Sequence, residues 1–514
     1  MQNALKNEIK RLSQKAFMKA ERAASTEKKY QRQFEKRTGL KAGAPKPSAP
    51  PPSRHFDPRY CARNANWLAK TIWHKVLSYK YEPSIAVNYL IPKADGSKRS
   101  VMAFSIPDAA LANITLRRAR TRNLKRLSPS SYAYHPNKNV FDAVIALNEF
   151  EPNGKLFAVQ IDFEKYFDNI PSSYIREKLN DEKKISLTPH EKHIFEQFLI
   201  HKYQDYREYS SKEFSRRHKG TPQGSSVSLL LANLANHDLD TALSAVPGRF
   251  VRFADDVVAL SDDYQSAQII EKCFINHCRT SGLVTNSKKS PGIAIISEHN
   301  HEIRTYRDFD YLGYRFSSNG LGVPDKVVRR IKQRISRLCN IYLLYYLRYG
   351  YVQHRSAQVP IPYDWDLLGF IYELRNSLYG GLSEEDLSLF INGGRRLPQM
   401  KGLMGFYCLI EDPTALRELD GWILSVTRRA MKQRNDILKN KFMSSCPTPS
   451  NKSLSVGNWL NLDAWDGEKK PDQRMPSLIR GWRAARKHYY TFGLESVQAP
   501  TYDTYSDISK LFEY

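Results

Sequence analysis

Two adjacent acidic residues, Asp255 and Asp256, interrupt an apolar stretch near the middle of the chain, residues 252–260 (RFADDVVAL). The β-branched and aromatic residues on both sides of this short polar break predict a tight hairpin that carries the acids at its tip. Two like charges near a buried sheet are costly unless a cation neutralises them, and a hard divalent ion bound by oxygen is the simplest remedy. A solvated Asp-Asp turn is the alternative, and the pair considered alone favours it.

A third carboxylate, Asp162, ends an earlier stretch of alternating residues, residues 155–162 (KLFAVQID), which predicts a strand. Nucleotides are joined by in-line phosphoryl transfer, and two divalent ions about 4 Å apart, held by shared carboxylates, serve this reaction well. Asp162, Asp255 and Asp256 are candidates to hold them, because a shared sheet can bring distant acids together. Each acid is weak evidence alone. Combined with the Gly-rich loop that opens residues 219–240 (KGTPQGSSVSLLLANLANHDLD) and with a strongly basic chain, the three favour this chemistry.

The composition indicates a polyanionic partner. The 514 residues include 79 Lys and Arg against 53 Asp and Glu, which gives a formal net charge of +26. Such a surplus favours nucleic acid over a membrane surface. The length predicts two or three domains, and no apolar run is long enough to cross a bilayer. The N-terminus lacks the apolar stretch of a secretory signal, while a basic transit peptide stays open as an alternative.

The cysteines indicate a reducing compartment. Six of them are scattered along the chain and form neither a disulfide framework nor a Cys-x-x-Cys pair. Cys273, His277 and Cys278 stand close together, but a half-buried helix is favoured there over a zinc site. A cytoplasmic location fits this pattern.

The N-terminal residues 1–40 are expected to form a basic helix, separated from the main body by a Pro-rich linker at residues 41–53. Apolar residues recur in this helix at steps of three and four, as a short heptad-like seam: Leu5, Ile9, Leu12, Ala16, Ala20 and Ala23. Three interpretations of residues 1–40 stay open: self-association through the seam, a solvated basic helix, or a disordered arm.

Several clusters of cations are expected to meet phosphate. Lys98 and Arg99 stand between a turn and a strand, where both can reach outward from a hairpin. The helix that follows ends in a basic run that includes Arg117 and Arg118, and phosphate contact is favoured there over a solvated face. From residue 325, apolar residues spaced at three and four predict a long amphipathic helix with a basic outer face. That outer face includes Arg330, Arg334 and Arg337.

Six motifs, in order along residues 85–320, resemble those of bacterial reverse transcriptases of the retron, group II intron and defence-associated kinds. They are SSYAYHPNKNVFDAV, IDFEKYFDNIP, GTPQGSSVS, RFADDVVAL, GLVTNSKKS and DYLGYRF. Chance agreement of so many motifs in order is remote. The sequence departs from the family at Ala133 and His135, where the first motif often has Gly and Arg, and at Thr285, a position that is usually apolar.

The resemblance implies a role for each matching residue. Asp162, Asp255 and Asp256 would hold two Mg²⁺ ions, with Mn²⁺ as an alternative and Asp256 as the less direct ligand. Lys289 would protonate the leaving pyrophosphate, with Lys288 as a close competitor. The residues expected to contact the incoming nucleotide are Lys98, Arg99, Phe163, Phe167, Gln223 and Gly224.

Phe167 is the residue expected to select deoxynucleotides, since its ring would occupy the space that a ribose 2′-hydroxyl needs. An ordinary core phenylalanine is the alternative. Leu312 and Gly313 would position the primer end. The basic helix from residue 325 is placed like a thumb, so the nucleic-acid-binding residues would be Arg117, Arg118, Arg330, Arg334 and Arg337.

The implied fold is α+β, that of a right-hand polymerase. Fingers and palm, built from an antiparallel sheet and helices, would occupy residues 54–320, and a helical thumb residues 321–442. The N-terminal helix would be an extension, and residues 443–514 a loop-rich basic C-terminal piece in which no motif is recognised.

The implied function is RNA-directed DNA synthesis from dNTPs, in bacterial anti-phage defence, on a template that is a structured non-coding RNA. The partners would be this RNA, the DNA product and, through the N-terminal helix, further copies of the chain, with no membrane. Two rivals stay open. One is another polymerase on the same palm, making DNA without a template or from a protein primer, or making RNA. The other is a non-catalytic RNA-binding scaffold, which the presence of all three acids disfavours.

Overall fold

The structure is a computed structural model, which describes residues 1–38, 40–44, 49–92, 96, 98–209, 213–287, 290–349, 364–393, 397–463, 465 and 470–497. Lys288 and Lys289 lie outside the described residues. The chain divides into two compact units. Unit 1 comprises Met1–Ser25, Lys46–Lys138 and Glu149–Tyr306, and unit 2 comprises Thr26–Pro45, Asn139–Asn148 and Arg307–Tyr514.

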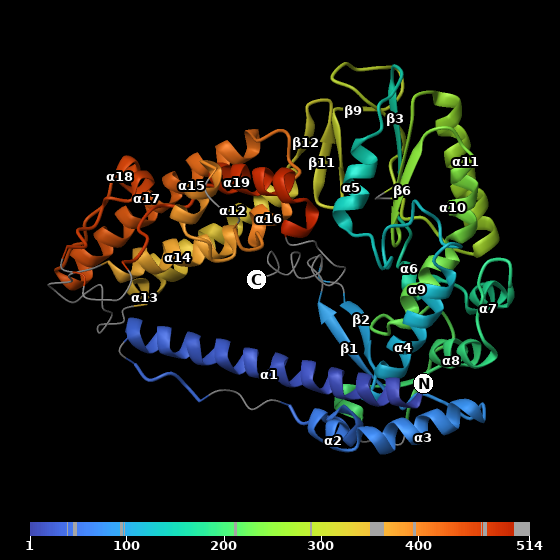
Figure 1. Cartoon of the computed structure of the whole chain (residues 1–514). Coiled ribbons are helices and arrows are strands. Elements are labelled where there is room, and N and C mark those ends of the chain that lie inside the picture. Colours follow the sequence, from blue (N-terminus) through green and yellow to red (C-terminus); the bar gives the residue numbers. More distant parts are fainter. Residues whose placement is uncertain are drawn as a thin grey trace. The chain divides into compact units, whose positions relative to one another are not determined.

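The larger sheet of unit 1, of which Figure 1 labels β3, β6 and β9, has five strands in the order β6-β7-β3-β8-β9. These strands are β3 (Leu156–Ile161), β6 (Arg249–Phe253), β7 (Asp256–Ser261), β8 (Gly292–Ile296) and β9 (Thr305–Tyr306). The central strand β3 pairs antiparallel with both β7 and β8. Every residue of β7 after Asp256 is buried, and α11 (Tyr264–Ser281) packs against β3, β7 and β8. The acidic hairpin therefore leads directly into β7, a strand that is buried in the core.

A second sheet of unit 1 has the order β2-β1-β4-β5, with β1 (Ala86–Pro92), β2 (Lys98–Ala103), β4 (Lys202–Asp205) and β5 (Ser215–Arg216). Strands β1 and β2 form the expected hairpin, whereas β1 and β4 run parallel, as do β8 and β9. The sequence predicts an antiparallel sheet, but each of these two sheets contains one parallel pair and is therefore mixed.

Helices cover the sheets of unit 1, and local signals begin several of them. Thr188 and Glu191 form a capping box at the start of α8, and Asp263 caps α11. The described helices of unit 1, apart from α1 and α11, are η1 (Arg54–Phe56), α2 (Pro58–Arg63), α3 (Ala65–Leu77), α4 (Ile106–Asn123), α6 (Tyr166–Asn169), α7 (Ser172–Asn180), α8 (Pro189–Leu199), η2 (Tyr206–Glu208), α9 (Val227–Ala235) and α10 (His237–Ser244).

The N-terminal helix α1 (Gln2–Thr38) is not the separate appendage that the sequence suggests, because its first turns are buried in unit 1. The Glu8 carboxylate is 5% exposed and accepts hydrogen bonds from Arg11, from Asn113 at 2.9 Å and from Arg117 at 3.1 Å. Burial alone would raise the pKa of Glu8, but these hydrogen bonds lower it to about 2. Leu5 and Ile9, the first two residues of the apolar seam, are buried as well, so their side chains are not exposed for a second copy of the chain.

Unit 2 combines a three-stranded antiparallel sheet with a group of helices. The strands are β10 (Asp308–Tyr311), β11 (Tyr314–Ser317) and β12 (Gly320–Gly322). The described helices that belong wholly to unit 2 are α5 (Val140–Asn148), α12 (Asp325–Cys339), the π-helical turn η3 (Asn340–Leu344), α13 (Tyr345–Arg348), α14 (Trp365–Tyr379), α15 (Glu384–Ile391), α16 (Gly402–Phe406), α17 (Thr414–Phe442), α18 (Asn451–Val456), α19 (Leu478–Phe492) and η5 (Leu494–Ser496). No described helix of either unit is apolar over a length that would cross a membrane.

The C-terminal piece contains more regular structure than the sequence indicates. Helix α19 packs against α15, α16 and α17. The Asp420 carboxylate of α17 accepts hydrogen bonds from the backbone N–H groups of Leu478 at 2.6 Å and Ile479 at 3.2 Å, which satisfies the first turn of α19. This part of residues 443–514 therefore packs within the helices of unit 2.

Candidate functional site

The acidic hairpin is as tight as the sequence predicts. Strands β6 and β7 are joined by two residues, Ala254 and Asp255, with Phe253 opposite Asp256. Ala254 has a φ of +64° and is 5% exposed. A positive φ at the first turn position suits the twist of a two-residue hairpin, yet for a residue with a Cβ it costs roughly 1–2 kcal/mol. The surroundings of the turn must therefore hold it in place.

The register of the sheet relates Asp162 to the hairpin. Ile161 is paired with Val257 across β3 and β7. Continued by one residue beyond β3, this antiparallel register would set Asp162 opposite Asp256, with both side chains on the same face. All three acids are partly exposed. The acid across from Asp162 is thus Asp256, the one that the resemblance gives as the less direct metal ligand.

The main chain of Asp162 is held from the β8 side. Its carbonyl accepts from the backbone N–H of Asn286 at 2.8 Å, and its N–H donates to the Ser290 hydroxyl at 3.1 Å. Ser290 N–H in turn donates to the Asn286 carbonyl at 2.9 Å. Asn286 and Ser290 flank Lys288 and Lys289. The sequence gives only a weak signal for these hydrogen bonds, namely the short hydroxyl side chain of Ser290.

The acids fit a divalent metal by donor type and by strand position, because carboxylate oxygens are the ligands that Mg²⁺ prefers. Nevertheless, within the part of the chain that the structure describes, no group of three or more His, Cys, Asp and Glu residues is arranged to hold a metal ion. The backbone brings the acids to one edge of the sheet, while their side chains do not close around a metal position.

The Gly-rich loop is clamped between the turn after β3 and strand β2. Thr221 N–H donates to the carbonyl of Phe167 at 2.6 Å, and Met102 N–H donates to the carbonyl of Gln223 at 2.7 Å. A Cβ atom at Gly224 would lie 2.2 Å from the Met102 carbonyl oxygen, and the φ of Gly224 is +113°. Only glycine fits at this position. The loop therefore brings Gln223 and Gly224 next to the strand that carries Lys98 and Arg99.

The two phenylalanines of the motif IDFEKYFDNIP differ in their surroundings. Phe167 on α6 is partly exposed and meets Tyr134 edge to face, with 6.5 Å between the ring centroids. Phe163 is 2% exposed and contacts the rings of Tyr166, Phe274 and His277. The Phe163 side chain therefore fills the core beneath α11, and its expected contact with the nucleotide stays a prediction.

The basic residues of unit 1 are only partly available. Lys98 and Arg99 are exposed on β2, opposite Pro92 and Ile91. Arg117 and Arg118 are both exposed, but Arg117 also pairs with the buried Glu8. One of the two cations expected on α4 thus has an intramolecular role.

The hairpin expected to position a primer joins β10 to β11 in unit 2. Leu312 and Gly313 form its two-residue turn, with φ values of +47° and +85°, as a type I′ turn requires. The Tyr407 hydroxyl donates to the Gly313 carbonyl at 3.1 Å, and a Cβ at Gly313 would lie 3.3 Å from the Phe406 ring. Contacts from α16 and the residue after it therefore hold this turn.

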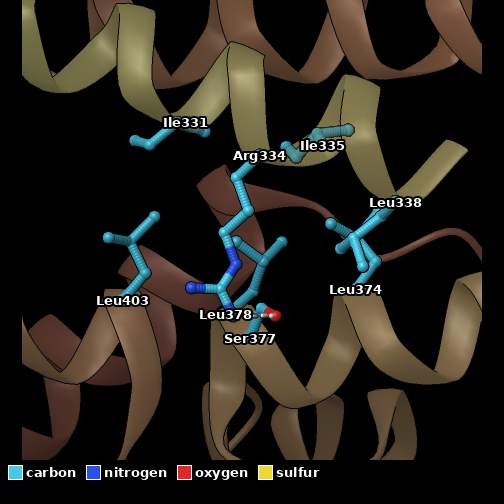
Figure 2. A pocket seen from close by; sticks show the side chains of 8 residues that line it. All are labelled: Ile331, Arg334, Ile335, Leu338, Leu374, Ser377, Leu378 and Leu403. Atoms are coloured by element: carbon cyan, nitrogen blue, oxygen red, sulfur yellow. Dashed lines mark hydrogen bonds between the residues drawn. The ribbon is translucent and has the colours of Figure 1, made fainter. Parts of the chain in front are cut away.

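Of the three arginines of helix α12 that are expected to bind nucleic acid, two are exposed and one faces inward. Arg330 and Arg337 are exposed, as expected. Figure 2 shows the guanidinium of Arg334 directed toward α14, where its Nη2 donates to the Ser377 hydroxyl at 3.2 Å. Arg334 lines a cavity of about 20 Å³, room for one water molecule, together with Ile331, Ile335, Leu338, Leu374, Ser377, Leu378 and Leu403. The expectation that Arg334 lies on the basic outer face is wrong.

A buried ion pair beneath the acidic hairpin is absent from the sequence predictions. Arg252 of β6 is 1% exposed and pairs with Asp240 of α10, which is 2% exposed. Its Nη1 also donates to the carbonyl of Ala254 at 3.0 Å. The sequence signal is a lone cation within the apolar run of Phe250, Val251 and Phe253.

Cys273, His277 and Cys278 all lie on α11, as the half-buried helix interpretation requires. His277 is 4% exposed, and its Nε2 lies 3.0 Å from the Asn236 Oδ1. Burial lowers the pKa of His277 to about 4. All six cysteines are free thiols.

Comparison with known proteins gives one family match. Residues 91–316 match the family described as reverse transcriptase (RNA-dependent DNA polymerase). No curated protein matches the chain.

Solved structures that resemble the chain include three telomerases. Apo telomerase from Candida tropicalis, truncated from the C-terminal domain, is 13% identical with a TM-score of 0.34, over 50% of this chain and 60% of that one. Telomerase from Candida albicans in complex with the TWJ fragment of telomeric RNA is 11% identical with a TM-score of 0.35, over 77% of this chain and 68% of that one. Apo telomerase from Candida tropicalis is 12% identical with a TM-score of 0.37, over 73% of this chain and 64% of that one.

The chain spans 60% of the length of the first of these telomerases, and similarities this weak add nothing to the family match. The matched segment runs from β1 into β11 and includes the acidic hairpin and Asp162. Over residues 91–316 the chain therefore contains a reverse transcriptase domain, which is the domain of RNA-directed DNA polymerases, a class of nucleotidyltransferases.

Proposed function

We propose that the chain copies an RNA template into DNA from dNTPs, and that Asp162, Asp255 and Asp256 hold two divalent ions for this reaction. The observation that carries the proposal is the register of β3 and β7, which leads Asp162 and Asp256 out of the same edge of one sheet. Bound Mg²⁺, or Mn²⁺ as an alternative, would activate the attacking 3′-hydroxyl and neutralise the triphosphate.

The side chains around this edge have separate tasks in the proposal. The loop with Gln223 and Gly224 lies against the incoming nucleotide, and Phe167 excludes a 2′-hydroxyl. Lys98 and Arg99 bind the triphosphate, since both are exposed cations on the strand that anchors this loop. Lys289 gives its proton to the leaving pyrophosphate, and Leu312 with Gly313 positions the primer.

The biological setting that we propose is anti-phage defence in the bacterial cytoplasm, with a structured non-coding RNA as template. The order and wording of the motifs support it, as does the surplus of 26 positive charges. A right hand of fingers, palm and thumb belongs to the same proposal, with Arg118, Arg330 and Arg337 along the nucleic acid. Self-association of α1 would depend on the part of the seam beyond Ile9.

The test is a paired substitution of the hairpin acids. Asp255→Ala with Asp256→Ala is expected to reduce Mg²⁺-dependent dNTP incorporation to background while RNA affinity stays within about twofold, because phosphate contacts dominate RNA affinity. Asp262→Ala is the matched control, since this acid directly follows the other end of β7. Undiminished synthesis by the double variant would contradict the assignment of the acids.

A further inference from the structure

The side chain of Arg252 is fully engaged within the core of unit 1. Its Nε donates to Asp240 Oδ1 at 2.7 Å and its Nη2 to Asp240 Oδ2 at 2.5 Å, a two-pronged pairing. Its Nη1 donates to Asn233 Oδ1 at 3.1 Å and to the Ala254 carbonyl at 3.0 Å. A buried ion pair is retained at a net cost unless its geometry and its other hydrogen bonds are good, and both conditions hold here.

The groups that hold Arg252 come from several parts of unit 1. Asn233 lies on α9, the helix that follows the Gly-rich loop, and Asp240 lies on α10. Asn233 Oδ1 also accepts from the Ser131 hydroxyl at 3.0 Å. Asp240 and Asn233 thus bind Arg252 from helices that are not part of the hairpin itself.

The main chain of Arg252 is fixed as firmly as its side chain. On one side it pairs with Val257 of β7. On the other side its N–H donates to the Ser130 carbonyl at 2.9 Å, and its carbonyl accepts from Tyr132 N–H at 2.9 Å. The guanidinium therefore reaches Ala254 from a residue that cannot easily shift.

The Ala254 carbonyl belongs to the peptide unit that continues into Asp255. Because Ala254 has a φ of +64°, this peptide would relax if nothing held it. We propose that Arg252 is a positioning residue: its hydrogen bond to the Ala254 carbonyl fixes the turn and thereby the direction in which the Asp255 carboxylate leaves the sheet. This inference rests on the proposed function of Asp255.

A purely structural role for the Arg252–Asp240 pair makes a different prediction, because such a pair can be replaced. Apolar residues of similar volume often substitute for a buried ion pair without loss of stability. The double variant Arg252→Met with Asp240→Leu removes both charges together, which keeps the fold testable, and it also removes the hydrogen bond to Ala254. Arg252→Lys keeps the charge but lacks the fork that reaches Asp240 and Ala254 at once.

The measurements separate positioning from folding. In single-turnover nucleotide addition, both variants are expected to lose about 100-fold in the maximal rate, with the half-saturating dNTP concentration within about threefold, since a small displacement of a catalytic group is costly. Mg²⁺ is expected to raise the Tm of the wild-type protein and to leave the Tm of both variants unchanged, because ligand-linked stabilisation reports metal binding without any turnover. Arg434→Lys is the matched control, because the buried Arg434 also pairs with an acid, Asp364 in unit 2 at 2.8 Å.

Each outcome has one meaning once Asp255→Ala is measured in parallel. If Asp255→Ala keeps its activity, the proposed function fails. If Asp255→Ala is inactive while the folded Arg252→Met/Asp240→Leu protein adds nucleotides at the wild-type rate, the positioning role alone is overturned. If Arg252→Lys has a lowered Tm but a normal rate and a normal Mg²⁺ response, the Arg252–Asp240 pair has only a structural role and the positioning role is likewise overturned.

Discussion

At the residue scale, two tight turns place a non-glycine residue at positive φ, and in both the neighbours supply the restraint. Ala254 is held by a hydrogen bond from Arg252, and Leu312 precedes Gly313, whose carbonyl accepts from Tyr407. Each such residue costs roughly 1–2 kcal/mol. Strain of this kind persists only where surrounding contacts determine the conformation, which fits turns whose side chains must point in one direction.

Phe163 and Phe167, the two phenylalanines of the motif IDFEKYFDNIP, give a residue-scale prediction. Phe167→Ala is expected to raise ribonucleotide incorporation relative to deoxynucleotide incorporation by about tenfold or more, because removing the partly exposed ring opens space for a 2′-hydroxyl. The measurement is the ratio of the two incorporation efficiencies on one template.

Phe163→Ala is the contrasting variant. Because Phe163 is 2% exposed, its truncation is expected to lower the free energy of unfolding by about 3–5 kcal/mol without changing the dNTP preference of the folded protein. An unchanged ratio in Phe167→Ala, or a changed one in Phe163→Ala, would reject the gate at Phe167.

Sequence spacing can place Asp162 but cannot sort out the residues after it. Alternation in residues 155–162 predicts a strand, and β3 ends at Ile161. Beyond that point the chain turns through Lys165 at a φ of +44°, which breaks the period of two. No periodicity then indicates which ring faces the core, so the sequence does not separate the buried Phe163 from the partly exposed Phe167.

At the element scale, α12 shows that not every arginine of a basic helix lies on its surface. Arg330→Ala with Arg337→Ala is expected to weaken RNA binding, because both side chains are exposed. The salt slope of the affinity is expected to fall by about 1 for each phosphate that the protein no longer neutralises. Arg334→Met is expected to leave the affinity and the slope unchanged, since its guanidinium is bound to Ser377.

Binding titrations at several salt concentrations measure both quantities. The result that would contradict this assignment is an equal weakening of RNA binding by Arg334→Met and by the exposed pair. That would mean that Arg334 leaves its cavity to meet phosphate.

The periodic elements are predictable from the sequence, and the long-range partners are not. Spacing in α12 indicates Ile331 and Ile335 as core residues, and both are buried. Arg334 lies at the border of that stripe, and its direction depends on Ser377, which comes from another helix. Likewise, Asp420 of α17 caps α19, and nothing in the sequence indicates that these two segments meet. Such contacts exist only once the tertiary fold is formed.

At the scale of the whole molecule, internal ion pairs do not remove the basic surplus. Glu8, Asp240 and other acids pair with arginines inside their own units. Even if each of the 53 acidic residues paired with one cation, 26 of the 79 Lys and Arg would remain. The composition therefore predicts a polyanionic partner, but it cannot say which arginines meet it, as Arg117 and Arg334 illustrate.

The stability of unit 1 is expected to depend on pH through two buried histidines. His201 and His277 are 2% and 4% exposed, and burial lowers the pKa of each from 6.5 to about 4. Between these values the unfolded chain binds more protons than the folded one, so stability rises with pH from about 4 to 6.5 and is level above that. Acidification through this window is expected to cost up to about 3 kcal/mol per histidine.

The check is Tm measured at pH 7.5 and pH 5 for the wild type and for His201→Gln with His277→Gln. The wild type is expected to lose more Tm on acidification than the variant, because glutamine takes up no proton. Glu8, whose pKa is lowered to about 2, loses its contribution only as the pH falls below about 4.5 toward 2, so it affects this comparison little. An equal fall of Tm in both proteins would show that the buried histidines do not set the acid sensitivity, and would shift the cause to the other carboxylates.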